Sequence, residues 1–363
     1  MTPDPAVPAG PATSPPLARL ARAAVAVGVV AFVAGVFSGH ALAALAALDA
    51  SWLFFAGLSA GAVALAAAVR IAHGGWARTV LPVADAAARF FPVALVLLLV
   101  LLLGARTLIP WTRDASALRV GGLALRQLLS SALVFGLGAR AVAVARRAGP
   151  GVRDPERVRV ASLVYVLGYV VGLSLWSFDL VMSLSDAPPY TVLPAYYFLG
   201  AFLSGLAWVA VVAAVQDRGG PDLRHDLGKL LFAFIVVWSY LLWALFLPTW
   251  YGNVPEESAA LLRRWTGPFR PVSAAVLVAV FAWPFWLLFS ERLKRRRATL
   301  AAGAGAILVG LWAERFLLVV PSLPASAGGA AAVLVGGGVA IGVAGLFLLA
   351  TSGGMARGAP TPG

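Results

Sequence analysis

One apolar stretch, residues 159–182, carries polar side chains at helical spacing and ends near a carboxylate. The series is Ser162, Tyr165, Tyr169, Gly172, Trp176, Asp179 and Ser183. Residues three and four apart share one face of a helix, and an ionisable group in an apolar span is costly enough to suggest a function. Asp179 is therefore a candidate proton acceptor at the edge of a quinol pocket or on a proton route. The structural alternative is a polar stripe that faces a bundle interior, with Asp179 hydrogen-bonded to a neighbour.

Two further apolar stretches contain charged residues. Glu314 and Arg315 are adjacent in the stretch 298–320, and Arg126 lies in the stretch 121–144. Side chains of adjacent helical residues point about 100° apart, so we expect Glu314 and Arg315 to find other partners rather than each other. Arg126 is one such partner for Glu314 or Asp179. A buried carboxylate–arginine pair of this kind either tunes a proton acceptor or fixes the packing of two helices.

Aromatic and hydroxyl side chains offer a candidate quinone site. A quinone needs an apolar slot, a flat aromatic wall and a hydrogen-bonding group at each carbonyl. The residues that we assign to this site are Trp176, Tyr197, Ser204 and Trp250. Aromatic residues are also common at the ends of membrane helices, where they form a belt.

The segment from Arg224 to Lys229 carries candidate proton-loading residues. His225 and Asp226 would lie where the seventh apolar stretch begins. In the structural alternative, Asp226 caps the helix and Lys229 extends its amine to the interface. No metal-binding constellation, nucleotide-binding loop or nucleophile–base motif is recognisable in the sequence.

The elements that must position these residues are membrane helices. Of the 363 residues, 61% are hydrophobic and 12% are charged, and the mean hydropathy is +0.90. Apolar blocks of about twenty residues, the length that crosses a bilayer, recur along the chain. We predict an all-α, polytopic membrane protein with spans near 17–38, 51–72, 90–109, 121–144, 159–182, 194–215, 228–250, 268–290, 298–320 and 329–351.

Residue counts exclude several kinds of redox site. The chain has no cysteine and three histidines, which excludes a thiolate-bound iron–sulfur cluster and a covalently attached haem c on this chain. His40, His73 and His225 fall at or near predicted helix ends, which argues against a haem b held by two histidines. We therefore expect no covalently bound cofactor here.

The distribution of the net charge of +13 is typical of a membrane protein and not of a protein that binds nucleic acid. If the N-terminus is cytoplasmic, the tails and the loops on the same side hold 20 of the 28 Lys and Arg residues. Basic residues concentrate in cytoplasmic loops. We therefore predict a bacterial inner-membrane protein with both termini in the cytoplasm, in contact with lipid and not with nucleic acid.

Short matches indicate an internal repeat with four spans between the copies. Leu58-Ser59-Ala60-Gly61 matches Leu203-Ser204-Gly205-Leu206, and Pro110-Trp111 matches Pro248-Thr249-Trp250. An even offset gives both copies the same orientation. The predicted organisation is a disordered tail (1–16), a first helix and loop (17–49), two four-helix units (50–193 and 194–323), and a last helix with a short tail (324–363).

Several longer motifs resemble one known family. The run Trp176 to Leu184 (WSFDLVMSL), the run Asp226 to Phe234 (DLGKLLFAF) and the run Trp250 to Glu257 (WYGNVPEE) are similar to segments of the second large membrane subunit of the bacterial alternative complex III. That subunit is NrfD-like, that is, similar to the membrane subunit of polysulfide reductase. The order and spacing of the matches agree from about residue 50 to 323.

The resemblance implies a fold of ten helices with two four-helix bundles. It also implies a set of partners, namely a sister NrfD-like membrane subunit, a periplasmic iron–sulfur subunit and haem c subunits. Such a complex oxidises quinol and reduces a periplasmic carrier, and this chain would bind quinone or conduct protons without a cofactor of its own. The matched positions are Asp179, His225, Asp226, Lys229, Asn253, Glu256 and Glu257.

The chain departs from the family pattern after Leu184, where it reads Ser185-Asp186-Ala187-Pro188-Pro189-Tyr190. The loop before the fourth span is also short. Both changes lie on the predicted outer side and argue against a conventional outer quinol pocket on this chain. Two other function classes remain open, a secondary transporter and a purely structural anchor for a periplasmic redox assembly.

Overall fold

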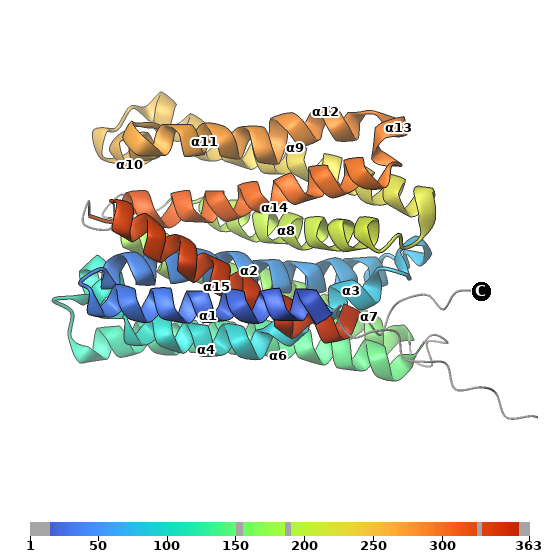
Figure 1. The fold of residues 1–363 in the computed structure, drawn as a ribbon, viewed down its shortest axis with the longest axis horizontal. Coiled ribbons are helices and arrows are strands. Elements are labelled where there is room, and N and C mark those ends of the chain that lie inside the picture. Colours follow the sequence, from blue (N-terminus) through green and yellow to red (C-terminus); the bar gives the residue numbers. More distant parts are fainter. Residues whose placement is uncertain (1–14, 150–154, 186–189, 325–328, 356–363) are drawn as a thin grey trace, which may run out of the picture.

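The computed structural model describes residues 15–149, 155–185, 190–324 and 329–355. These residues form helices and short connections, without strands. They include ten helical spans long and apolar enough to cross a membrane, so the predicted all-α polytopic fold is confirmed (Figure 1). The spans are Pro16–Phe37, Ala41–Ile71, Leu81–Leu103, Ala117–Ala148, Pro155–Leu184, Leu193–Val215, Gly220–Gly252, Gly267–Phe289, Arg297–Ser322 and Ala330–Gly353.

Several spans consist of more than one helix. The α-helices are α1 (Pro15–Phe37), α2 (Ala41–Ile71), α3 (Leu81–Ala86), α4 (Phe91–Leu103), α5 (Ala105–Leu108), α6 (Ala117–Ala148), α7 (Pro155–Leu180), α8 (Leu193–Val215), α9 (Gly220–Gly252), α10 (Pro255–Trp265), α11 (Arg270–Leu277), α12 (Trp283–Phe289), α13 (Glu291–Lys294), α14 (Arg297–Val319) and α15 (Ala330–Met355). The short 3₁₀ turns are η1 (Gly75–Ala77), η2 (Ala87–Phe90), η3 (Pro110–Thr112), η4 (Met182–Leu184), η5 (Gly267–Phe269) and η7 (Val320–Ser322), and η6 (Val278–Ala282) is a π-helical turn.

Some predicted boundaries were wrong because hydropathy locates the apolar centre of a span and not its ends. The second helix was expected to begin at 51 but begins at Ala41, so Asp49 lies inside it. Alanine is the best helix former, and the run 41–50 is rich in it. The third span runs from Leu81 to Leu103 instead of 90–109. Residues 1–14 of the predicted disordered tail lie outside the described residues. The same holds for residues 186–189, most of the loop that departs from the family pattern.

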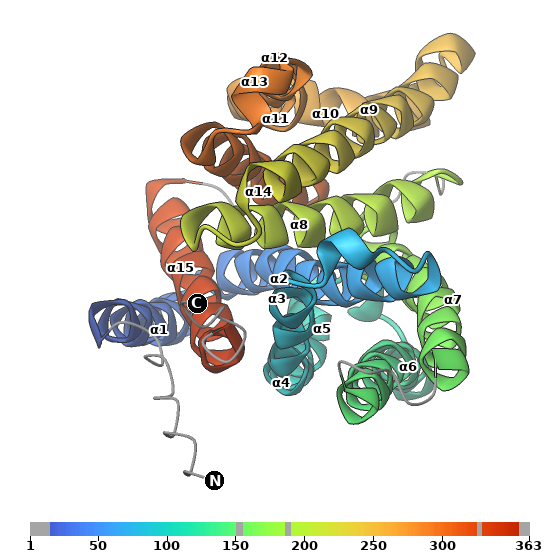
Figure 2. The same cartoon turned by 90° about the vertical axis from the view of Figure 1, so that its right-hand side faces the viewer.

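Helices α2 and α8 cross at the centre of the molecule with their backbones in contact (Figure 2). A Cβ atom on Gly61 would lie 2.0 Å from the Ala201 carbonyl oxygen, and one on Gly205 would lie 2.2 Å from the Ala62 nitrogen. Glycine alone permits this approach. The two glycines belong to the two copies of the predicted repeat motif, so these copies pack against each other.

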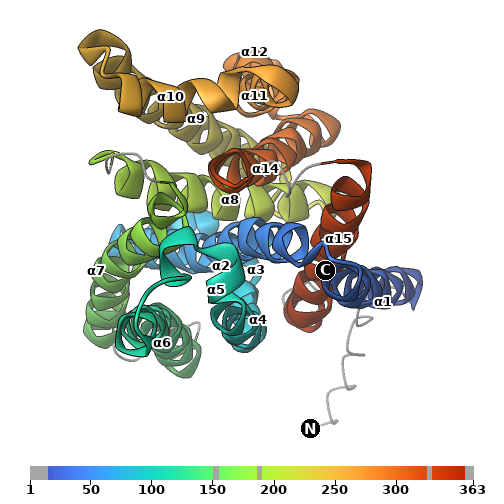
Figure 3. The ribbon, with the colours of Figure 1, turned by 90° about the vertical axis from the view of Figure 1, so that its left-hand side faces the viewer.

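The helices around this crossing are arranged alike on both sides. Helix α7 packs against both α2 and α8, and α14 likewise packs against both α8 and α2. Helices α4 and α6 complete one side, and α9, α11 and α12 complete the other (Figure 3). Two parallel repeats related by an axis along the membrane normal would make these contacts. The division into units 50–193 and 194–323 stays a prediction.

The first and last spans pack together outside the eight central ones. Helices α1 and α15 lie side by side along most of their length (Figures 1 and 2). A Cβ atom on Gly28 would lie 2.4 Å from the Gly342 Cα atom, and one on Gly338 would lie 2.5 Å from the Ala31 Cβ atom. Glycines four residues apart in α15 therefore allow this close packing.

Candidate functional site

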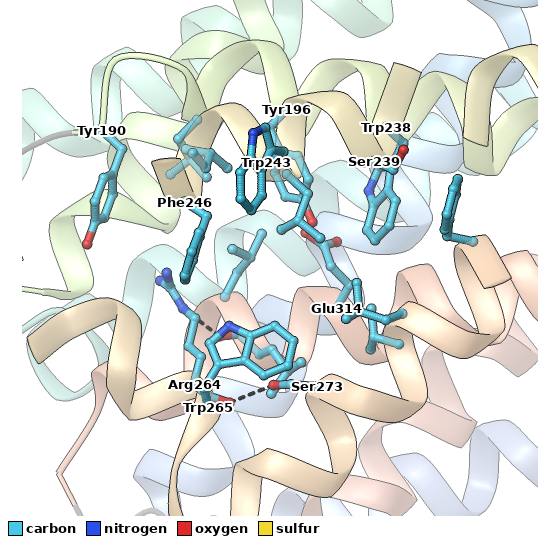
Figure 4. A pocket seen from close by; sticks show the side chains of 18 residues that line it. Tyr190, Tyr196, Trp238, Ser239, Trp243, Phe246, Arg264, Trp265, Ser273 and Glu314 are labelled. Carbon is cyan, nitrogen blue, oxygen red and sulfur yellow. Dashed lines mark hydrogen bonds between the residues drawn. The ribbon is translucent and has the colours of Figure 1, made fainter. Parts of the chain in front are cut away.

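A cavity of about 360 Å³ lies among α8, α9, α10, α11, η6 and α14 (Figure 4). Its volume falls within the range of small-molecule sites, roughly 300–1,000 Å³. The aromatic lining residues are Tyr190, Tyr196, Trp238, Trp243, Phe246, Trp265 and Phe281, and the other polar ones are Ser239, Arg264, Ser273 and Glu314. The cavity is thus an aromatic slot with a few polar groups.

Helix α9 forms one wall of the cavity. Trp238, Leu242 and Phe246 lie four residues apart, so they project from one face of the helix. Trp238 is buried against Tyr196 of α8, with ring centroids 5.8 Å apart. Trp243 also lines the cavity but is 53% exposed. The cavity therefore reaches close to the surface that would face lipid.

The opposite wall contains the π-helical turn η6, between α11 and α12. Pro284 has no backbone N–H, so it cannot donate the α-helical hydrogen bond to the carbonyl of Val280. A π turn adds a residue to one helical turn and is frequent at functional sites. Here it lies beside the cavity and contributes Phe281 to its lining.

The short helix α10 brings a basic side chain to the cavity. Helix α9 ends at Gly252 and is followed by Asn253, which adopts the left-handed conformation (φ 48°) typical of helix ends, and α10 begins at Pro255. The Nε atom of Arg264 donates to the Leu317 carbonyl at 3.1 Å. The Ser273 hydroxyl donates to the Arg264 carbonyl at 2.6 Å. These bonds attach α10 to α14 and α11.

Arg264 is the cationic group of the cavity. Burial lowers the pKa of Arg264, whereas its neighbours Tyr190, Tyr196 and Glu314 act in the opposite direction. An arginine side chain nevertheless stays protonated in proteins. Arg264 and Tyr190 lie toward one end of the cavity, and Glu314 and Ser239 lie toward the other (Figure 4). A bound molecule can therefore meet a hydrogen-bond donor at one end and a carboxylate at the other.

Glu314 is buried in α14, and its side chain lies close enough to the Tyr196 hydroxyl to interact with it. The expectation that Glu314 and Arg315 cannot pair was wrong, since Arg315 Nη1 lies 2.8 Å from Glu314 Oε2. The arginine side chain is long enough to reach the neighbouring carboxylate, although the two side chains leave the helix about 100° apart. Arg315 Nη2 also donates to the Tyr197 carbonyl at 3.2 Å.

Asp179 and Arg126 form a second polar cluster, which does not line the cavity. Arg126 Nε donates to Asp179 Oδ2 at 2.6 Å, its Nη2 atom bonds Oδ1, and Gln127 Nε2 donates to Oδ2 at 2.6 Å. Asp179 is buried, whereas the Arg126 side chain is 49% exposed. Of the two predicted partners for Arg126, the structure places Asp179 there and not Glu314. A carboxylate–arginine pair fits both interpretations of Asp179, so its role as a proton acceptor stays a prediction.

None of the four residues assigned to a quinone site lines this cavity. Trp176 packs against Trp52, with ring centroids 4.7 Å apart. Tyr197 donates its hydroxyl to the Leu53 carbonyl at 3.0 Å, and Ser204 donates to the Ala201 carbonyl at 2.8 Å. Trp250 is 62% exposed. Their aromatic and hydroxyl groups are thus used in packing or lie on the surface.

His225 and Asp226 lie near the start of α9, at the opposite end from α10. Asp226 does not cap this helix, because the helix begins six residues earlier at Gly220, and it pairs instead with Lys229 at 2.8 Å. A hydrogen bond from Arg295, followed by the charge of His225, lowers the pKa of Glu291 in α13. Whether His225 and Asp226 load protons stays a prediction.

The sequence reasoning missed Asp49 and most of the cavity. Asp49 is fully buried in α2. It was missed because the predicted start of that helix lay after it. Trp238, Ser239 and Ser273 carried no signal beyond ordinary membrane-helix composition. Glu314 is the one predicted site residue that lines the cavity. No family model and no curated protein matches the chain.

Proposed function

We propose that this chain is a membrane subunit of a quinol-oxidising respiratory complex of the alternative complex III type, and that it binds quinol in the cavity beside Glu314. The observation that carries the proposal is the arrangement of an aromatic slot between the buried carboxylate of Glu314 and the half-buried guanidinium of Arg264. A quinol has the complementary shape, a flat apolar ring with an oxygen at each end.

The ring would lie among Trp243, Phe246 and Trp265, since these side chains border the space between the polar ends (Figure 4). Arg264 would donate a hydrogen bond to the oxygen at one end. At the other end, Glu314 would accept a hydrogen bond from the quinol hydroxyl. The half-exposed Trp243 marks where a lipid-soluble substrate would enter from the bilayer.

Glu314 would act as the proton acceptor. Oxidation of a quinol to a quinone releases two electrons and two protons, and the Glu314 carboxylate takes one of these protons. General bases must lie within hydrogen-bond reach of the proton that they accept, which the position of Glu314 allows. The electrons pass to redox groups of partner subunits, an iron–sulfur protein and haem c proteins, because this chain has no cysteine to hold such groups.

The proposal includes an orientation. If the basic loops face the cytoplasm, as their charge suggests, the α10 end and the cavity lie on the periplasmic side of the inner membrane. Protons released from quinol there would leave on the periplasmic side. Asp179 lies outside the cavity, so the proposal moves the proton-accepting role from Asp179 to Glu314.

A matched pair of variants tests the proposal in the complex purified with its partners. We expect Glu314→Gln to lower quinol oxidation at least tenfold, because the amide keeps the shape of the side chain but does not accept a proton. Asp114→Asn, on an exposed connection outside the cavity, serves as the control. Copurification of haem c and iron–sulfur subunits distinguishes this function from that of a transporter, and unchanged turnover in Glu314→Gln would favour a purely structural anchor.

A further inference from the structure

A second, smaller cavity of about 170 Å³ lies where α1, α2, α4 and α15 meet. Every residue that lines it is apolar or glycine. Val29 and Val33 of α1 form one wall, Leu97 of α4 forms the other, and Leu48 of α2 contributes to the floor. Val29 and Val33 are exposed, and in a membrane the exposed surface of these helices faces lipid. The cavity is therefore a groove that opens to the bilayer.

The groove has the length of one leaflet. Arg22, Val25, Val29 and Val33 follow one another at spacings of three and four, so they share one face of α1. A helix rises about 16 Å over the eleven residues from Arg22 to Val33. The hydrocarbon core of a bilayer is roughly 30 Å thick, so this distance is about half of it. One acyl chain that starts beside Arg22 would thus follow the groove to the middle of the membrane.

Arg22 lies at one end of the groove, one helical turn before the lining residue Val25. Its Nε atom donates to the Ala18 carbonyl at 3.3 Å, so the side chain extends back toward the start of α1 and the membrane interface. Helix α15 passes this point as well. A Cβ atom on Gly345 would lie 2.7 Å from the carbonyl oxygen of Ala21, and the next residue of α15 lines the groove.

Arg89 lies at the same end, on the opposite side of α15. Phe90 packs against Phe347 of α15, with ring centroids 5.4 Å apart, and Phe347 directly follows a residue that lines the groove. A Cβ atom on Gly353 would lie 3.1 Å from Arg89 Nη1. Helix α15 therefore places Arg22 and Arg89 at similar depths, both at the end where α15 itself ends.

The charge at this end of the groove is of one sign. Helices α1, α4 and α15 contain no acidic residue. The Asp85 carboxylate of the neighbouring helix α3 is paired with Arg70 at 2.6 Å. Basic groups beside apolar surface between membrane helices are the arrangement that binds the headgroups of anionic lipids. The groove and its basic end are thus complementary to an acyl chain and a phosphate.

We propose that this groove binds an anionic phospholipid, with one acyl chain between α1 and α4 and the phosphate beside Arg22 and Arg89. In the orientation given above, the lipid belongs to the cytoplasmic leaflet. It would connect the outer pair of helices, α1 and α15, to α4 of the central bundle. The proposal uses no residue of the cavity beside Glu314, so it does not depend on quinol binding there.

Native mass spectrometry of the full chain in detergent tests the headgroup site. The probes are dioleoyl phosphatidylglycerol, which is anionic, and dioleoyl phosphatidylcholine, which has the same chains but is zwitterionic. We expect the anionic lipid to bind at least about fivefold more tightly, since each basic residue adds to the attraction. Arg22→Gln should raise the Kd of the anionic lipid about fivefold and leave that of the other lipid unchanged. Arg119→Gln is the control, because Arg119 is exposed at the start of α6, at the opposite end of the molecule.

A second pair of variants tests the groove. Leu97→Trp places an indole in the space for the acyl chain, and we expect the Kd of both lipids to rise at least tenfold. Leu99→Trp is its control, since Leu99 lies on the exposed side of the same helix. If Leu97→Trp does not fold, the arginine variants alone decide.

Three results would overturn the inference. The first is equal affinity of the unchanged protein for the two lipids, and the second is an equal effect of Arg22→Gln and Arg119→Gln on the anionic lipid. The third is a dimer without bound lipid, which would mean that a second copy of the chain covers the groove. Quinol oxidation can persist or fail in each case, so the inference and the proposed function are tested separately.

Discussion

Arg315 donates a hydrogen bond to the main-chain carbonyl of Tyr197 and stacks over the ring of the same residue, 4.5 Å from its centroid. These two contacts fix the guanidinium between α8 and α14, where it also neutralises Glu314. The approach depends on Gly200, because a Cβ atom there would lie 2.7 Å from Arg315 Nη2. A buried carboxylate at the cavity is thus paired with a cation that these contacts hold in place.

Filling the cavity should block the binding of quinol. Val276 of α11 is buried and lines the cavity, so Val276→Phe would place a ring in the space that a ligand needs. We expect the Kd of a quinone analogue to rise at least tenfold, measured by quenching of tryptophan fluorescence. Val278→Phe is the matched control, because Val278 is 55% exposed and lies two residues along the same span. Equal affinity in the two variants would refute this location of the site.

Removing the cation of the cavity should weaken binding as well. Arg264→Gln removes the charged donor, and a hydrogen bond to a charged group is worth about 1.5–3 kcal/mol, which corresponds to roughly 10- to 100-fold in Kd. The adjacent Arg263 is exposed, so Arg263→Gln should change the Kd by less than about twofold. Titration of both variants with the same quinone analogue measures the difference. A comparable loss in both would mean that overall charge, and not the cavity, decides affinity.

Asp179 should contribute to stability rather than turnover. In Asp179→Asn, the carboxylate that accepts from Arg126 and Gln127 is lost. We expect the apparent free energy of unfolding to fall by about 1–3 kcal/mol, nearer the lower value because Arg126 is half exposed. Thermal denaturation in detergent measures this fall, and quinol oxidation of the assembled complex should stay within about twofold. A tenfold loss of turnover without a loss of stability would instead make Asp179 a proton carrier.

The crossing of α2 and α8 should not tolerate a methyl group. Gly61→Ala places a Cβ atom against the Ala201 carbonyl oxygen, at an unrelaxed distance of 2.0 Å. Backbone on both sides prevents a local adjustment, so we expect a destabilisation of at least about 2 kcal/mol and a lower yield of folded protein. Gly136→Ala in α6 meets nothing within 4 Å and should be neutral or stabilising. Size-exclusion profiles and melting temperatures of the two variants decide the matter.

The class of fold could be predicted from hydropathy, whereas the site depended on tertiary packing. Periodicity correctly gave α7 a buried polar face ending at Asp179, because a span that is polar on one side must turn that side inward. It could not show that the Trp176 ring packs against Trp52 and is thereby used in the core. Nor could it show that the space beside Glu314 is left open between α9 and η6. Asp49 was missed because its charge lowers the local hydropathy, and the predicted start of the helix was therefore placed after it.

Photolabelling of the assembled complex with an azido-quinone tests the central claim most directly. The account predicts that the labelled peptides contain residues 238–246 of α9 and 264–277 of α10 and α11, and that Val276→Phe abolishes the labelling. Labelling confined to the peptides around Trp176 and Asp179, or labelling that Val276→Phe leaves unchanged, would contradict a quinol site beside Glu314.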